Sequence, residues 1–408
     1  MTEAAAHRHV VIVGASLAGT RTAQSLRTLG HTGPITLIGA EAELPYDRPP
    51  LSKSLLKGEW SQASVDEIRL AGPAEFAELA VELRLGAAAV GLDTAARSVR
   101  LGDGTTVPYD VLVIATGAAA RPSPWLPEGV HQLRTLDDAR SIAARLALGE
   151  PVVVVGGGFI GTEIAAAARG YGCAVTIVDP VPEPMARLVG PEIAGGLVDL
   201  HRRNGTETRF GAGVVGIEGT PGELTVELDN GERLPASTVV VGIGSVPSTG
   251  WLAGSGLNLD NGVATDGFLR ALGADDVYAV GDVAHWPHPG RGHGVRAEHW
   301  TNASDQARYV AEAITKGLQD AYEPTDYVWS DQYDWKVNAF GRRDPEGTSL
   351  VIGDLAENGK VAVIHATATG AACGAVTVNW VRALNQARRL LPAATPAQDI
   401  ANAIQKLL

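Results

Sequence analysis

The sequence is poor in cysteine. Only Cys173 and Cys373 occur in 408 residues, and they lie far apart along the chain. Two isolated thiols give no disulfide framework, no metal-ligand cluster and no CxxC redox motif. We therefore expect both cysteines to fill space, and we expect no metal site.

Targeting segments and an excess of basic residues are also missing. The N-terminal stretch MTEAAAHRH lacks the apolar core of a signal peptide, and no apolar run is long enough to span a membrane. The formal net charge of −13 argues against a general nucleic-acid binder, although it leaves room for a local basic patch. We expect a cytoplasmic protein, a monomer or weak homodimer, that binds neither membrane nor nucleic acid.

What the sequence does contain is typical of an ordered α/β protein. A chain of 408 residues is long enough for two or three domains, each with its own core. A hydrophobic content of 45% with a charged content of 19% indicates a globular fold. The 49 glycines suit an architecture with many turns.

A dinucleotide-binding fingerprint begins at the apolar run Val152–Val155, which predicts a central parallel strand. The strand leads directly into Gly156-x-Gly158-x-x-Gly161. The first glycine allows a tight turn, the second lets the backbone approach a pyrophosphate, and the third lets helix and strand pack closely. The following helix would direct free N–H groups and a positive dipole end at the phosphates.

The rest of this stretch supports the same prediction. A helix over Thr162–Gly172 and a strand over Ala174–Val178 are expected, and Asp179 follows where a carboxylate can bind ribose hydroxyls. A 2′-phosphate about 4 Å from this carboxylate would meet a repulsion of about 4 kcal/mol at an effective dielectric constant of about 20. No basic residue follows before Arg187, so the sequence favours NAD over NADP.

A second, less regular fingerprint lies near the N-terminus. A strand over Val10–Val13 leads into Gly14-Ala-Ser16-Leu17-Ala18-Gly19, and a helix from about Thr20 to Leu29 should follow. Ser16 stands where the middle glycine is usual, but it is small enough for close approach of the backbone. After a strand over Ile35–Ile38, Glu41 is the candidate for the ribose.

The two fingerprints belong to a larger duplication. Each is followed by a hairpin turn signal, at 102–104 and 229–231. Each then has a strand, Val111–Ile114 or Val239–Val241, that ends in a small-residue turn. These turns are Ala115-Thr116-Gly117 and Gly242-Ile-Gly244. Two nucleotide-binding domains of one plan suggest two redox cofactors that exchange electrons.

A third nucleotide element follows the second domain, because a short strand ends at Gly281-Asp282. Alone it would be an ordinary turn; after the duplication it indicates a flavin motif, with the second domain inserted in the first. From Asp326 onward, strands at 349–352, 361–367 and 374–378 and a helix at 379–391 predict a small α+β domain. The expected domains are 1–118 with 248–325 for FAD, 119–247 for NAD, and 326–408 at the C-terminus.

Three motifs carry a specific resemblance: Pro45-Tyr-Asp-Arg48-Pro-Pro-Leu-Ser-Lys53, His299-Trp300-x-x-Ala303, and Trp329-Ser-Asp-Gln-Tyr333. With them, nearly the whole chain resembles the NADH-dependent ferredoxin reductases that serve bacterial oxygenases, the putidaredoxin reductase and biphenyl dioxygenase reductase type. This family has a glutathione-reductase-like fold of FAD and NAD domains with an interface domain.

The resemblance implies two cofactors, FAD and NAD, and two catalytic residues, Lys53 and Glu163. Lys53 would lie near the reactive flavin nitrogen and pair with Glu163, which would orient the nicotinamide amide. Trp329 would lie near the flavin. Gly14, Gly19, Glu41, Arg48, Lys53 and Asp282 resemble FAD contacts. The other expected cofactor-binding residues are Ser16, Leu17, Ala18, Ala115, Thr116, Gly117, Gly156, Gly158, Phe159, Ile160, Gly161, Glu163, Asp179, Gly244, Gly281, Trp300 and Trp329.

Each of these roles has a plainer alternative. Lys53 and Glu163 could be ordinary surface charges, and Trp329 could be a tryptophan that packs two domains together.

The absence of cysteine between Met1 and Gly172 excludes a thiol beside the flavin, as disulfide reductases require. Electrons must then leave through the flavin edge.

The implied reaction passes electrons from NADH to FAD and then singly to an iron–sulfur ferredoxin that supplies a cytochrome P450 or a Rieske oxygenase. A rubredoxin reductase, or an NADH-responsive binding flavoprotein similar to apoptosis-inducing factor, is the alternative. Because ferredoxins are usually acidic, local basic residues should steer docking unless they merely solvate the surface. The candidates are Arg296, Arg308, Lys336, Arg342, Arg343, Arg388 and Arg389.

Overall fold

The computed structural model describes residues 7–58, 60–125, 127–289, 291–317, 320–324, 326–391 and 395–408. Residues 1–6 lie outside the described residues. They make up most of the N-terminal stretch in which the sequence shows no signal peptide. Contacts divide the chain into two compact units. The first holds Met1–Asp47, Gln62–Ala119 and Ser245–Thr325, and the second holds Arg48–Ser61, Ala120–Gly244 and Asp326–Leu408. The three domains expected from the sequence stay a prediction.

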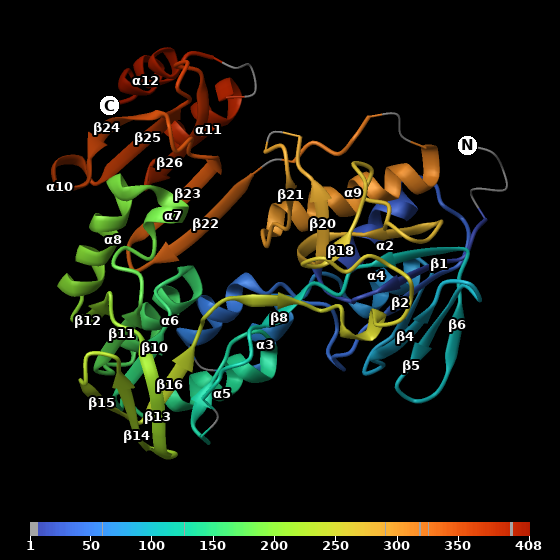
Figure 1. Cartoon of the computed structure of the whole chain (residues 1–408), viewed down its shortest axis with the longest axis horizontal. Coiled ribbons are helices and arrows are strands. Elements are labelled where there is room, and N and C mark those ends of the chain that lie inside the picture. The colour runs from blue at the N-terminus through green and yellow to red at the C-terminus, as the bar shows by residue number, and fades with distance from the viewer. Residues whose placement is uncertain are drawn as a thin grey trace. The chain divides into compact units, whose positions relative to one another are not determined.

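The first unit, which contains the strands labelled β1 and β2 in Figure 1, is built on a parallel five-stranded sheet in the order β19-β7-β1-β2-β3. Its central strands are buried along their whole length, as expected for apolar strands covered on both faces. β19 pairs with β7 in parallel, so the chain returns to its first sheet after the second fingerprint. The strands are β1 (Val10–Val13), β2 (Ile35–Ile38), β3 (Val81–Arg84), β7 (Val111–Ile114) and β19 (Val277–Ala279).

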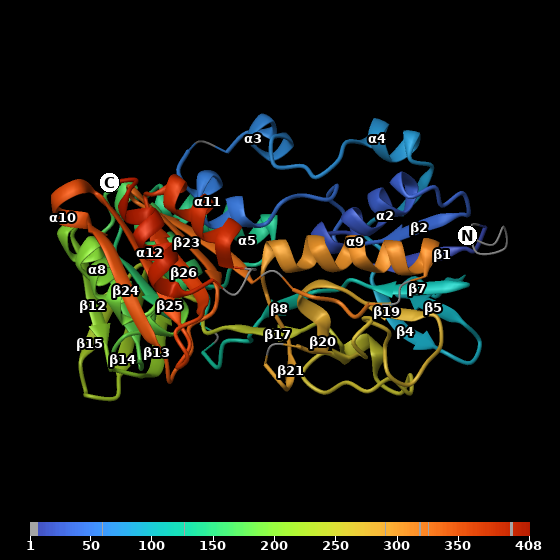
Figure 2. The same ribbon diagram turned by 90° about the horizontal axis from the view of Figure 1, so that it is seen from above.

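The two faces of this sheet are covered differently. Val10 and Ile12 pack with residues of α2 (Leu17–Thr28) and α9 (Trp300–Lys316), which run side by side in Figure 2. Val11 and Val13 point the other way, because side chains alternate along a strand. They pack against a three-stranded antiparallel sheet of β4 (Ala89–Asp93), β5 (Ser98–Leu101) and β6 (Thr106–Pro108). Smaller elements of this unit are α3 (Gln62–Asp66), α4 (Pro73–Glu78), β17 (Ser245–Pro247), β18 (Val263–Ala264), β20 (Ala284–Pro287) and β21 (Gly294–Val295).

The second unit repeats the plan around a parallel sheet in the order β12-β11-β10-β16-β9. Val153 and Val155 pack against the antiparallel β13-β14-β15 sheet, as their counterparts do in the first unit. A capping box of Thr135 and Asp138 starts α5. The strands are β9 (Val130–His131), β10 (Val152–Val155), β11 (Val175–Asp179), β12 (Thr206–Phe210), β13 (Val214–Thr220), β14 (Glu223–Leu228), β15 (Arg233–Ala236) and β16 (Thr238–Val241), and the helices are α5 (Leu136–Leu146), α6 (Phe159–Gly170), α7 (Ala186–Val189) and α8 (Pro191–Arg203).

The C-terminal part of this unit is an antiparallel sheet in the order β22-β23-β26-β25-β24. One face, with Ile364 and Ala375, packs against α11 and α12, and the other, with Val363 and Val376, packs against α7 and α8. The elements are β22 (Tyr327–Gln332), β23 (Trp335–Gly341), β24 (Thr348–Asp354), α10 (Leu355–Asn358), β25 (Lys360–Ala366), β26 (Ala372–Val378), α11 (Val381–Leu390) and α12 (Ala397–Gln405).

Helix starts differ most from the sequence predictions. α6 begins at Phe159, three residues before the expected Thr162, because Gly158 is its extended N-cap. α2 likewise begins at Leu17. The last predicted helix begins at Val381, since Asn379 has a φ of 52°, outside the helical region. β23 and α12 were not expected from the sequence.

Candidate functional site

The first fingerprint forms a tight turn between β1 and α2. Gly14 has a φ of 118°, and a Cβ there would lie 2.1 Å from the carbonyl oxygen of Ala115. A Cβ on Gly19 would lie 1.9 Å from the carbonyl oxygen of Gly14. Both positions require glycine. Ser16 is the N-cap residue of α2, and the N–H groups in the first turn of a helix can bind an anion.

Gly281 and Asp282 lie against this turn. The backbone N–H of Gly281 donates to Oε1 of the buried Gln306 over 2.7 Å, and a Cβ on Gly281 would lie 3.1 Å from the Cβ of Ala18. Because β19 is next to β7, it delivers this turn to the same sheet edge as Ala115, Thr116 and Gly117. The structure thus brings together the two motifs predicted to hold FAD, and Leu17 is buried beside them.

Two further FAD candidates of the first unit are held by polar contacts. Glu41 accepts a 2.5 Å hydrogen bond from the hydroxyl of Tyr46, which can hold its carboxylate in one orientation. Trp300, the first residue of α9, donates from Nε1 to Asp47 over 2.8 Å. Tyr46 and Asp47 were not predicted, although both belong to the Pro45–Lys53 motif.

The second fingerprint repeats this construction with a cleaner set of glycines. A Cβ on Gly156, whose φ is 114°, would lie 2.3 Å from the carbonyl oxygen of Gly242. A Cβ on Gly161 would lie 2.0 Å from the carbonyl oxygen of Gly156. At Gly158 a Cβ would meet no atom within 4 Å. That open space, directly before the first turn of α6, fits a pyrophosphate.

The remaining NAD candidates border this loop. Phe159 packs against the apolar cluster formed by α7, α8 and the C-terminal sheet, whereas Ile160 is exposed. Gly244 follows β16 and accepts a hydrogen bond from the backbone N–H of Arg121 over 2.9 Å.

Asp179 is the last residue of β11, and its carboxylate is already engaged with backbone groups. Oδ2 accepts from the N–H of Gly157 over 2.7 Å, and Oδ1 accepts from the N–H of Val181 over 2.8 Å. These bonds fix the carboxylate at the end of the strand and leave a lone pair on each oxygen for a ribose.

Lys53 and Glu163 meet in the second unit. Lys53 Nζ lies 2.9 Å from Glu163 Oε2, with the two side chains 17% and 3% exposed. The same oxygen accepts from Ser52 Oγ over 2.5 Å. The other oxygen, Oε1, accepts from Ser330 Oγ over 2.5 Å. The ion pair implied by the resemblance is therefore present, with Glu163 buried and Lys53 partly buried, so Glu163 is not an ordinary surface charge.

The Trp329 motif supplies part of this cluster. Ser330 comes from β22, whose next inward-facing residue is Gln332, and both are fully buried. Trp329 stacks on Tyr327 with ring centroids 5.9 Å apart. The motif was predicted from the sequence without a role for the serine and glutamine, because only the fold shows that Ser330 bonds to Glu163 of α6 and Gln332 to His201 of α8.

Arg48 opens the segment that carries Lys53, and it lies in the second unit. Its guanidinium donates to the backbone carbonyl of Arg134, just before α5. The Arg48–Ser61 segment thus packs with α5 and α6, while Gly14, Glu41 and Asp282 belong to the first unit.

The two cysteines are unsuited to redox catalysis. Burial raises the pKa of both thiols, and each Sγ donates to a backbone carbonyl, Cys173 to Leu146 and Cys373 to His365. Protonated thiols are poor nucleophiles.

Among the described residues no group of three or more His, Cys, Asp or Glu side chains could hold a metal ion. No described helix is long and apolar enough to cross a membrane.

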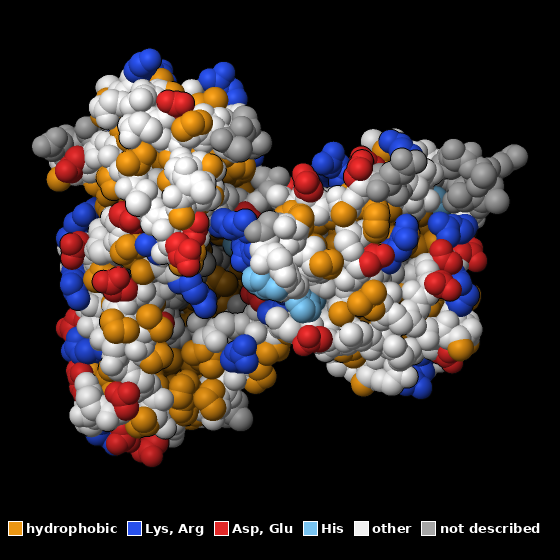
Figure 3. All heavy atoms as spheres, turned by 45° about the horizontal axis from the view of Figure 1, so that its top comes forward, with side chains coloured by type: hydrophobic (Ala, Val, Ile, Leu, Met, Phe, Trp, Pro, Cys, Tyr) orange, Lys and Arg blue, Asp and Glu red, His pale blue; other side chains and the backbone are white. Residues whose placement is uncertain are grey.

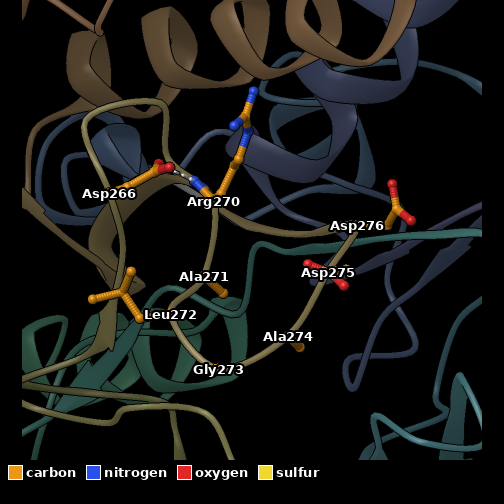
Figure 4. A pocket seen from close by; sticks show the side chains of 8 residues that line it. All are labelled: Asp266, Arg270, Ala271, Leu272, Gly273, Ala274, Asp275 and Asp276. Carbon is orange, nitrogen blue, oxygen red and sulfur yellow. Dashed lines mark hydrogen bonds between the residues drawn. The ribbon is translucent and has the colours of Figure 1, made fainter.

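The first unit also has a pocket of about 410 Å³, which none of the predicted cofactor-binding residues lines (Figure 4). It is lined by Asp266 and by the loop 270–276. Asp266 accepts from the backbone N–H of Arg270, and Asp276 pairs with two arginines of the same unit. The carboxylates of Asp266 and Asp276 at this pocket are thus engaged in bonds within the first unit, and we assign the pocket no role in cofactor binding.

Comparisons with known proteins agree with this geometry. Residues 8–307 match the family model described as pyridine nucleotide-disulphide oxidoreductase, and residues 327–406 match the reductase C-terminal model. Rhodocoxin reductase of Rhodococcus erythropolis is 37% identical over 392 residues, which cover 95% of this chain and 90% of that one. The ferredoxin–NAD(+) reductase component of the anthranilate 1,2-dioxygenase system of Burkholderia cepacia is 39% identical over 389 residues, 94% of each chain.

Solved structures give the same result. The ferredoxin reductase for the CYP199A2 system of Rhodopseudomonas palustris superposes with a TM-score of 0.91 at 34% identity, over 96% of this chain and 97% of that one. The covalent putidaredoxin reductase–putidaredoxin complex gives a TM-score of 0.89 at 32% identity, over 97% and 95%. The chain therefore belongs to the pyridine nucleotide-disulphide oxidoreductase family and, within it, to the ferredoxin–NAD(+) reductases of oxygenase systems.

Proposed function

We propose that this chain is an FAD-dependent ferredoxin–NAD(+) reductase that passes electrons from NADH to an iron–sulfur ferredoxin, which supplies a cytochrome P450 or a Rieske oxygenase. The observation that carries the proposal is the pair of glycine cradles, one per unit, in a chain whose two thiols both have a raised pKa and bond to backbone carbonyls. Two dinucleotide sites without a reactive thiol suit electron transfer between two bound cofactors.

In this proposal each predicted site residue has a role in binding a cofactor or in the reaction. The glycines of each fingerprint and the following helix bind a pyrophosphate, and Glu41 and Asp179 bind ribose hydroxyls. Glu163 orients the nicotinamide amide, and Lys53 supplies a positive charge close to the reacting atoms. FAD, when bound, accepts a hydride and gives up single electrons. Trp329 lies at the flavin edge through which electrons leave for the ferredoxin.

The proposal is tested with the purified flavoprotein in a stopped-flow instrument. Mixing with NADH should bleach the flavin absorbance rapidly, and cytochrome c should be reduced quickly only after a ferredoxin is added. A panel with rubredoxin distinguishes the rubredoxin-reductase alternative. A protein that is reduced by NADH but passes electrons to no member of the panel would instead fit an NADH-responsive binding protein, and a colourless protein that takes up no FAD would refute the proposal.

We propose that the ferredoxin is acidic and docks on basic residues of the C-terminal domain. Figure 3 shows acidic and basic side chains interspersed on the face in view, and with a net charge of −13 we expect steering to depend on a local group of basic residues. Arg342 and Arg343 are exposed in the turn after β23, and Arg388 lies over the rings of Tyr327 and Phe340. Arg296 is a weak candidate, because it pairs with Glu298 and is 11% exposed.

Reversing the charge of Arg342 and Arg343 together should slow ferredoxin reduction about tenfold at low ionic strength, because both lose attraction and gain repulsion. The difference should shrink as salt is added. Ferredoxin-dependent cytochrome c reduction over a salt series measures both effects. NADH-driven flavin reduction is the internal control and should not change. An unaltered rate with an unaltered salt dependence would remove these arginines from the docking surface.

Asp179 should set the preference for NADH. Asp179→Ser and Asp179→Asn both remove the charge that repels a 2′-phosphate, and the asparagine keeps one acceptor for the loop N–H groups. We expect the ratio of the dissociation constants of NADPH and NADH to fall at least tenfold in both variants, on the order of 1.4 kcal/mol. Titration by flavin fluorescence quenching measures the ratio. Glu183→Gln, in the same loop and exposed, is the matched control; a ratio that moves only in that variant would contradict the assignment.

A further inference from the structure

A buried chain of hydrogen bonds leads away from the Lys53–Glu163 pair into the second unit. Glu163 Oε1 lies 2.5 Å from Ser330 Oγ, which lies 3.1 Å from Gln332 Nε2. Gln332 Oε1 in turn lies 2.9 Å from His201 Nε2. The four side chains are between 0% and 3% exposed. They come from α6, β22 and α8, which are close together in Figure 1.

The far end of the chain fixes the direction of every bond. His201 Nδ1 is buried and has no hydrogen-bond partner among the described residues. A proton on Nδ1 would be an unpaired buried donor, so the neutral ring should carry its proton on Nε2. Burial lowers the pKa of His201, which keeps the ring neutral at pH 7. Nε2–H can then only donate, and Gln332 must present its carbonyl oxygen to it.

The amide orientation determines what Ser330 can do. With its oxygen on His201, Gln332 presents its NH₂ group to Ser330 Oγ, which accepts that bond. The single hydroxyl proton of Ser330 is then directed at Glu163. If the amide were turned over, Ser330 would donate to Gln332, and Glu163 Oε1 would lose its donor.

We infer that His201 and Gln332 are positioning residues that make Ser330 a permanent donor to Glu163 and so hold its carboxylate in one orientation. Ser52 and Lys53 fix the other oxygen. The inference rests on the proposed function, in which Glu163 must keep its place while the nicotinamide arrives and leaves. Neither His201 nor Gln332 contacts Glu163 itself in the hydrogen bonds described above.

Nuclear magnetic resonance tests the direction of the chain without reference to turnover. In holoprotein labelled with ¹⁵N-histidine, two-bond ¹H–¹⁵N spectra distinguish the two neutral tautomers. The pattern absent from the His201→Gln variant belongs to His201. We expect the Nε2–H tautomer; an Nδ1–H pattern or a charged ring at pH 7 would overturn the inference even if the enzyme is fully active.

Kinetics test the effect on Glu163. His201→Leu removes the donor and should lower the limiting rate of flavin reduction by NADH between about tenfold and a hundredfold. His201→Gln places an amide N–H near the same position and should restore the rate to within about twofold of wild type. His365→Leu is the matched control, since His365 is 3% exposed, His201 is 2% exposed, and His365 bonds to Ser349 rather than to the groups around Glu163.

The outcomes separate the two proposals. If NADH does not reduce the flavin of the wild-type protein, the proposed function fails. If wild type is reduced but the leucine variants at 201 and 365 are equally slow or equally fast, the positioning role fails and the proposed function stands. Loss in His201→Leu alone, with recovery in His201→Gln, supports the positioning role.

Discussion

Replacing Gly158 with alanine should raise the dissociation constant for NADH at least tenfold without destabilising the chain. A Cβ at this position meets no protein atom within 4 Å, so the substitution has nothing in the free protein to displace. The open space lies where the backbone must approach the pyrophosphate, and a methyl group there would occupy it. A tenfold loss corresponds to about 1.4 kcal/mol of binding free energy.

Gly161→Ala is the contrasting variant on the same loop. Its Cβ would lie 2.0 Å from the carbonyl oxygen of Gly156 and 3.2 Å from Cγ1 of Val154, so α6 must move away from β10. Overpacking of this kind costs about 1–3 kcal/mol of unfolding free energy. We expect this variant to lose both stability and NADH affinity.

Three measurements distinguish the two variants: urea unfolding, NADH titration and flavin content. Gly158→Ala should match wild type in unfolding and in bound FAD, and differ only in NADH affinity. Gly19→Ala, in the first fingerprint, should instead reduce FAD content. If Gly158→Ala binds NADH normally, or loses FAD rather than NADH, the assignment of the second fingerprint to NAD is wrong.

The strands of both sheets could be predicted from the sequence because they are short apolar runs covered on both faces. β1, β2, β7 and β10 have the expected bounds. The first residues of α2 and α6 could not be predicted as accurately, because both helices begin inside the fingerprint motif and not after it. Ser16 and Gly158 are the N-caps, and each helix begins at the next residue.

The polar cluster around Glu163 shows what sequence patterns cannot supply. The Lys53 segment, α6 and β22 are separated by more than a hundred residues each, yet Ser52 and Ser330 donate to the same carboxylate. Nothing in a serine's local sequence marks it as a donor to a buried acid, because the partner is fixed by tertiary packing. The motifs at 45–53 and 329–333 were the only local signals, and they pointed to the segments without naming these two hydroxyls.

The cysteines set this chain apart from what its family description suggests. The family is described as pyridine nucleotide-disulphide oxidoreductase. Here desolvation raises the pKa of both thiols, that of the buried Cys173 beside β11 and that of the half-buried Cys373 within β26. Beside Glu163 lie Ser52 and Lys53, and neither cysteine of the chain is among the groups that bond to this carboxylate in the described structure.

The charge of Lys53 should matter for both stability and rate, and the two effects can be separated. Lys53→Met leaves Glu163, which is 3% exposed, with two hydroxyl donors and no countercharge. Removing one partner of a buried ion pair should lower the unfolding free energy by about 3 kcal/mol. Losing a cation aimed at the reacting atoms should slow NADH-driven flavin reduction by about a hundredfold. Lys57→Met, an exposed lysine of the same segment, should change neither.

The double variant Lys53→Met/Glu163→Gln tells these effects apart. Neutralising both partners removes the uncompensated buried charge, so urea unfolding should recover most of the lost stability. The rate of flavin reduction in the stopped-flow instrument should stay low, because both the cation and the carboxylate proposed to act on the nicotinamide are missing. Recovery of the rate together with the stability would mean that the pair only holds the segment 48–61 against α6. A rate that stays low in a restored fold would show that the Lys53–Glu163 pair acts in the reaction itself and does not only hold the segment in place.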